Sequence, residues 1–235
     1  MSKNFLFVCL TAVAFTLFSC DDGPIERAES TPHYNGFAAK VTGHVSGTDS
    51  WPEYYQVVLA GFDESEYATA QVLISPAADG SVAQTLPNLG STVKTVELCV
   101  TNTLRRRIIT FKSIDVSALQ GDTLYLDAGT VDVNMFNSIQ TEIFDNNCAH
   151  CHGGTGTAAG GLFLTEGRSY AELVNQPSQS VPDSTRVIPY NAEWSILHQI
   201  LLSDEVLNLP VTHGDILNDQ NRRLIDEWIN AGAKE

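Results

Sequence analysis

The stretch TVELCVTNTLRRRIITFK, residues 95–112, decides how the first half of this chain folds. Apolar and more polar residues alternate in 96–101, and the alternation resumes in 109–112 after a turn-forming stretch at 101–103. A period of two is typical of strands that bury one face, so the two runs predict an antiparallel hairpin. Cys99 lies within the first run, where we expect a packed strand residue rather than a reactive thiol.

Similar short runs lie on both sides of this hairpin, separated by Gly, Pro, Asp and Asn. They predict about six strands and no convincing helix before residue 133. The expected strands are 38–46, 54–62, 69–75, 92–101, 105–114 and 123–128. This spacing favours a β-sandwich of immunoglobulin-like or transthyretin-like type over residues 37–132.

The periodicity changes after residue 133. Asn134 is a candidate N-cap, and the apolar residues of 136–144 follow it at helical spacing. Shorter helical patterns follow near 170–174, 194–201 and 218–229, with Gly232 placed to end the last one. The expected fold class is therefore multidomain, an all-β sandwich followed by an all-α domain over residues 133–235.

The first residues resemble a secretory signal. Lys3 precedes an apolar or small-residue run from Phe5 to Phe18 that ends at Ser19-Cys20. A small residue before cysteine is typical of lipoprotein signals, so residues 1–19 are a predicted signal peptide and Cys20 the predicted lipidation site. The polar residues 20–36 then form a tether. An ordinary cleaved signal with an incidental cysteine is the alternative. In both cases we expect the protein to be exported. If Cys20 is lipidated, we expect the protein to be anchored in the bacterial envelope, on the periplasmic or surface face of the outer membrane.

The composition argues against several classes of protein. The 235 residues contain 13 Lys plus Arg against 28 Asp plus Glu, for a net charge of −15. Apart from Arg105 to Arg107 the chain has no basic stripe, so nucleic-acid binding is not expected. A hydrophobic fraction of 43% also argues against a disordered chain and a multi-span membrane protein.

The motif Cys148-Ala149-His150-Cys151-His152 carries the chemistry. Two thiols at this spacing reach the two vinyl groups of one haem, and the adjoining His152 then points at the iron. We therefore expect one covalent haem c, attached at Cys148 and Cys151 and ligated by His152. Zinc would need two further Cys or His ligands at comparable spacing, and a redox dithiol would need a thioredoxin-like setting.

Residues 139–233 resemble the small planctomycete-type monohaem cytochrome c domain. The similar stretches are 143–148, 160–162, 170–174, 186–189 and 226–233. The resemblance implies a cytochrome c-like helical domain at the end of a bacterial lipoprotein. It also implies electron transfer through a single haem, without catalytic residues.

The sequence departs from that family at the sixth iron ligand. The family presents a methionine from a Met-Pro-Pro-Gly loop, but residues 209–214 here read LPVTHG, and Leu209 has no lone pair to offer. Met135 lies too far along the first helix and is expected in the core. His213 is the candidate replacement, which would make a bis-histidine site. The alternatives are His198 and an open sixth position.

Arg186 is a further candidate, because a guanidinium can neutralise a haem propionate by a bidentate contact. The alternative is a solvated loop arginine. The first functional hypothesis is an electron carrier that is not an enzyme and whose acidic surface docks on a redox partner protein. The alternatives are a five-coordinate haem sensor and a surface binding protein with an accessory haem. Peroxidase chemistry would need a distal base, for which only His198 and His213 are candidates.

Overall fold

The computed structural model describes residues 36–154, 156, 158–203 and 213–235. The predicted signal peptide, Cys20, the tether up to residue 35 and the stretch 209–212 lie outside the described residues. Residues 35–235 belong to one compact unit. No helix in the described ranges is long and apolar enough to cross a membrane.

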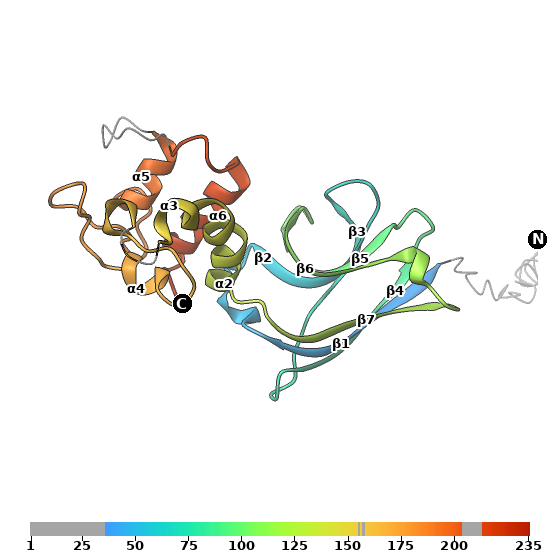
Figure 1. Cartoon of the computed structure of the whole chain (residues 1–235). Helices are drawn as coiled ribbons and strands as arrows, with labels where there is room; N and C mark the ends of the chain where they lie inside the picture. Colours follow the sequence, from blue (N-terminus) through green and yellow to red (C-terminus); the bar gives the residue numbers. More distant parts are fainter. Residues whose placement is uncertain (1–35, 155, 157, 204–212) are drawn as a thin grey trace, which may run out of the picture. The chain divides into compact units, whose positions relative to one another are not determined.

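Two β-sheets make up most of the regular structure (Figure 1). The first has the strand order β4-β1-β7 and the second the order β3-β2-β5-β6. β1 runs antiparallel to β4 and parallel to β7, whereas all neighbours in the second sheet are antiparallel. The strands are β1 (Phe37–Ser46), β2 (Tyr55–Phe62), β3 (Ala68–Leu73), β4 (Ser81–Leu89), β5 (Thr95–Asn102), β6 (Arg107–Asp115) and β7 (Thr123–Asp132).

The hairpin expected in residues 95–112 is confirmed, because β5 and β6 pair in antiparallel register. Val96, Leu98 and Val100 are buried in the main core. Cys99 points to the opposite face of the sheet and is also buried there, in a smaller apolar cluster. This burial raises the pKa of its thiol, which agrees with a packed strand residue.

β4 has no counterpart among the six expected strands. Its sequence, SVAQTLPNL, mixes polar and apolar residues without regular alternation and contains Pro87. Proline cannot donate a ladder hydrogen bond, and it is tolerated at a sheet edge. β4 lies at such an edge, paired with β1.

The helices after residue 133 are short. Asn134 caps the first of them, since its side chain accepts hydrogen bonds from the backbone of Phe136 and Asn137, and Asn218 caps the last. They are α2 (Met135–Ile139), the π-helical segment η4 (Gln140–Cys148), α3 (Ala149–His152), α4 (Ser169–Leu173), α5 (Ile196–Leu202) and α6 (Asp219–Asn230). Short 3₁₀ turns are η2 (Thr48–Ser50), η3 (Val116–Ala118) and η5 (Ala159–Gly161).

The expected fold class, an all-β sandwich followed by an all-α cytochrome c-like domain, is therefore wrong. The described residues are mostly in two sheets with a few short helices, and they show no substantial all-α C-terminal domain. Glycines and prolines within 153–195 restrict the helical patterns there to one or two turns. The apolar faces of these helices also join the same hydrophobic cluster as the strands, rather than enclosing a core of their own.

Direct hydrogen bonds join the second sheet and its flanking loop to the helices. The Trp51 indole donates to the carbonyl of Val133 over 2.6 Å, and the Tyr55 hydroxyl donates to the carboxylate of Glu227 on α6. Burial raises the pKa of both Tyr55 and Glu227, and the contact with Glu227 raises that of Tyr55 further. The Trp51 bond holds Val133 just before the Asn134 cap of α2, and α2 leads through η4 into the site described next.

Candidate functional site

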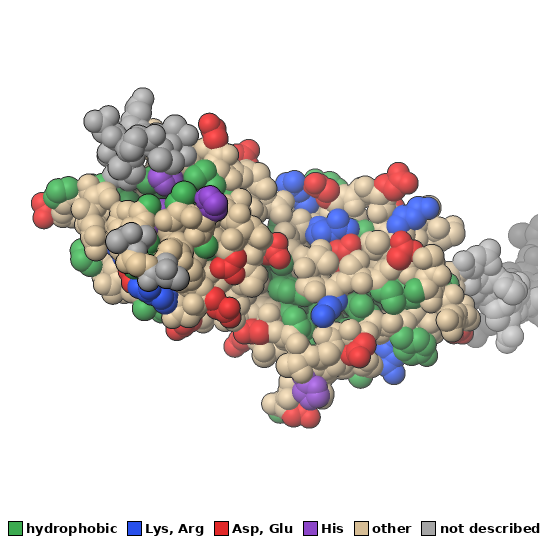
Figure 2. Space-filling model, viewed as in Figure 1, with side chains coloured by type: hydrophobic (Ala, Val, Ile, Leu, Met, Phe, Trp, Pro, Cys, Tyr) green, Lys and Arg blue, Asp and Glu red, His purple; other side chains and the backbone are tan. Residues whose placement is uncertain are grey.

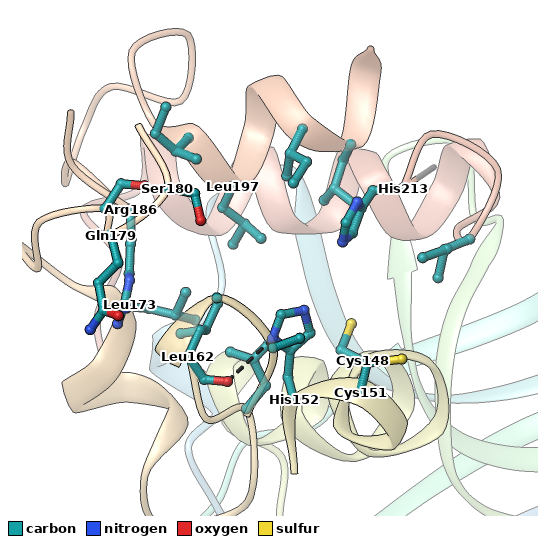
Figure 3. A pocket seen from close by; sticks show the side chains of 18 of the residues that line it. Cys148, Cys151, His152, Leu162, Leu173, Gln179, Ser180, Arg186, Leu197 and His213 are labelled. Atoms are coloured by element: carbon teal, nitrogen blue, oxygen red, sulfur yellow. Dashed lines mark hydrogen bonds between the residues drawn. The ribbon is translucent and has the colours of Figure 1, made fainter. Parts of the chain in front are cut away.

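A cavity of about 370 Å³ opens among η4, α3, α5 and the loops between them. Its volume lies in the range of small-molecule sites. Figure 3 shows Cys148 and Cys151 at one end of this cavity and Gln179, Ser180 and Arg186 at the other, with His152 between them. The walls between the two ends are mainly leucine and isoleucine side chains, including Leu164, Leu173, Leu197, Ile200 and Leu201.

The cysteine and histidine side chains of the motif meet because η4 runs directly into the single turn of α3. Both thiols are free, and Cys148 is partly buried whereas Cys151 is exposed. Burial, with a smaller contribution from Cys151, raises the pKa of the Cys148 thiol to about 11. Both cysteines are among the residues that line the cavity.

His152 is oriented by a backbone carbonyl. Its Nδ1 lies 3.2 Å from the carbonyl oxygen of Leu162 (Figure 3). A carbonyl only accepts hydrogen bonds, so Nδ1 carries the proton and Nε2 keeps its lone pair. Burial also lowers the pKa of His152, which favours the neutral imidazole that a metal requires.

The turn that presents this carbonyl depends on two glycines. Gly160 and Gly161 of η5 have φ angles of 60° and 59°, in the left-handed region that other residues avoid. A Cβ added to Gly161 would lie 2.1 Å from Oε1 of Gln179. The backbone geometry of the turn at 160–161 therefore favours glycine at both positions.

His213 lies across the cavity from His152 (Figure 3). The centres of the two rings are 6.3 Å apart, and the ring planes are inclined by 42°. A transition metal held between two imidazoles needs about 2.0 Å per bond and about 1.1 Å from each nitrogen to its ring centre, or about 6.2 Å between the centres. The observed separation fits such a pair of axial ligands.

His198 and Met135, the other two residues considered as sixth ligand, do not line the cavity. Nδ1 of His198 lies 2.6 Å from Oδ1 of Asp226, so His198 joins α5 to α6, and it is not one of the residues that line the cavity. Met135 is buried in the core at the start of α2. Among the described residues, no group of three or more His, Cys, Asp or Glu side chains is arranged to hold a metal ion.

Arg186 is buried, with 7% of its surface exposed, so it is not a solvated loop arginine. One guanidinium nitrogen, Nη1, donates to the backbone carbonyl of Glu172 over 2.7 Å and lies 3.1 Å from its carboxylate. The other, Nη2, donates to the carbonyl of Gly161 over 3.1 Å. Arg186 also lines the polar end of the cavity, where a propionate contact was expected.

Sequence reasoning missed several of these groups. No sequence pattern marks a backbone carbonyl such as that of Leu162, or neutral side chains such as Gln179 and Ser180, as part of a binding site. The Glu172 carboxylate was likewise not anticipated as the partner of Arg186. The paired glycines at 160–161 were the one sequence feature that could have indicated the turn that presents the Leu162 carbonyl, since adjacent glycines are typical of backbone with positive φ.

No protein-family model matches the chain, and no curated protein matches it. Among solved structures, hydrazine synthase of Kuenenia stuttgartiensis is similar at 13% sequence identity and a TM-score of 0.29. The alignment covers 87% of this chain and 44% of that one. A TM-score this low does not indicate a common fold.

Proposed function

We propose that this chain is a c-type haem protein that transfers electrons through one covalently attached haem. The observation that carries the proposal is the pairing of His152 and His213 across a cavity that also contains both motif cysteines. Two imidazoles alone would be an incomplete ligand set for an iron ion. A porphyrin would supply the remaining nitrogen ligands, so His152 and His213 together with the two cysteines fit a haem.

The two ends of the cavity support the same ligand. Haem carries its vinyl groups along one edge and its propionates along the opposite edge. Cys148 and Cys151 would form the thioether bonds at one end, while Gln179, Ser180 and Arg186 would receive the propionates at the other.

Two axial histidines favour electron transfer over ligand sensing. Bound haem supplies an iron that cycles between the ferric and ferrous states. With His213 as the sixth ligand, no position would be left open for a diatomic ligand. No catalytic residue is required, and we propose none.

The surface charge indicates the kind of redox partner. Acidic side chains are spread over the face seen in Figure 2, and the whole chain carries a net charge of −15. We propose a partner protein with a basic docking face, bound more weakly as ionic strength rises.

The direct test is the spectrum and mass of the wild-type protein, produced together with the machinery that attaches haem to exported cytochromes. We expect a mass increase of one haem that survives denaturation, low-spin spectra in both oxidation states, and no immediate uptake of carbon monoxide. A high-spin protein that binds carbon monoxide at once would favour the sensor. A protein without covalent haem would contradict the proposal.

We further propose that the chain is lipid-anchored in the bacterial envelope through Cys20, on the sequence pattern alone. In the native host, Cys20→Ser is expected to move the protein from the membrane fraction to the soluble fraction. Cys9→Ser is the matched control, because Cys9 lies in the segment that would be removed. A Cys20→Ser protein that stays in the membrane fraction contradicts the anchor.

A further inference from the structure

Two hydrogen bonds from one short segment hold His152. The imidazole Nδ1 bonds the Leu162 carbonyl, and the backbone carbonyl of His152 accepts a 2.7 Å hydrogen bond from the amide of Leu164. The position of residues 162–164 therefore determines both the backbone and the ring of this histidine.

This segment is held from both sides. At one end Nε2 of the buried Gln140 donates to the carbonyl of Leu164 over 3.1 Å. At the other end Arg186 donates to the carbonyl of Gly161, the residue directly before Leu162. Two backbone hydrogen bonds already close this turn, from the amides of Gly161 and Leu162 to the carbonyls of Ala158 and Ala159, and the Arg186 contact adds a side-chain bond that joins the turn to the residues around Glu172.

Arg186 is itself fixed by Glu172 of α4. Its contacts with the backbone carbonyl and the carboxylate of Glu172 leave Nη2 free to reach Gly161 at the same time. The guanidinium group is planar and rigid, so its two terminal nitrogens can bond Glu172 and Gly161 at the same time. A lysine has a single ammonium nitrogen on a flexible side chain and cannot keep both hydrogen bonds in these geometries.

We propose that Arg186 is a positioning residue for the iron-binding histidine. Arg186 bonds both the turn at 160–162 and Glu172 of α4, and so fixes the position of the Leu162 carbonyl. That carbonyl in turn keeps the His152 ring in the orientation, and with the proton on Nδ1, that iron binding through Nε2 requires. This role differs from a propionate contact, and it rests on the proposed function, because His152 needs this orientation only if it binds iron.

The test uses the haem-loaded protein with ¹⁵N-labelled histidine in the ferrous state. The readout is the rate at which the Nδ1 proton of His152 exchanges with solvent, measured beside haem content and thermal stability. In Arg186→Lys we expect about tenfold faster exchange, the effect of weakening one hydrogen bond.

Gly161→Ala provides a second variant in case the first fails to fold. It strains the same turn, because alanine is disfavoured at the φ of 59° that Gly161 adopts, and it leaves Arg186 in place. We expect a similar acceleration of exchange. Arg106→Gln is the control, since Arg106 forms an exposed ion pair with Glu66, at 2.9 Å, in the turn between β5 and β6 and away from the cavity, and its exchange rate should match the wild type.

Unchanged exchange in haem-loaded Arg186→Lys and Gly161→Ala would overturn the positioning role. Equal acceleration in Arg106→Gln would also overturn it, since general loosening of the fold would then explain the effect. A wild type without covalent haem would instead contradict the proposed function, so the two failures are distinguishable.

Discussion

His213→Ala is expected to convert the six-coordinate, low-spin haem into a high-spin form that binds carbon monoxide. The His213 ring faces His152 at the spacing of two axial ligands, and alanine offers no lone pair. The iron would lose one strong-field ligand, and the vacated position would admit small ligands. Optical spectra of both oxidation states, with and without carbon monoxide, measure the change.

His198→Ala is the matched control for this variant. His198 lies on α5 but bonds Asp226 and does not line the cavity. We therefore expect its spectra to stay low-spin. If His213→Ala remained low-spin, or if His198→Ala became high-spin, the assignment of His213 as sixth ligand would be wrong.

Replacing both Cys148 and Cys151 with alanine is expected to abolish covalent haem attachment. The two thioether bonds are the proposed covalent links, and the axial histidines alone would hold haem exchangeably. If the exchangeable haem is lost, the apolar side chains between α3 and α5 lose the group they would pack against. We expect the free energy of unfolding to fall by about 3 kcal/mol, which lowers Tm by roughly 10 °C in a protein of this size. Denaturing mass spectrometry and thermal melting measure the two effects.

Cys99→Ala is the control for this second prediction. Cys99 is also a free thiol, but it is buried in the second sheet, outside the cavity. The variant should keep its full complement of covalent haem. Haem that resisted denaturation in the Cys148 and Cys151 double variant, or was lost from Cys99→Ala, would show that the attachment residues are wrongly assigned.

Local patterns predicted local structure. Alternation in residues 95–112 predicted the hairpin of β5 and β6, and Asn134 and Asn218 predicted two helix starts. Such features depend on neighbours a few residues apart, whose spacing is visible in the sequence. The sequence alone also placed both thiols and His152 within one turn.

Only the tertiary structure decided the fold class and the completed site. The helical patterns after residue 133 predicted a separate all-α domain, but those helices are short and share the core of the sheets. β4 was missed because pairing with β1 compensates for its weak strand pattern. The meeting of His152 with His213 and with the Leu162 carbonyl, and the burial of Arg186, bring together residues that lie far apart in the sequence. Such long-range contacts depend on packing, which local residue spacing does not encode.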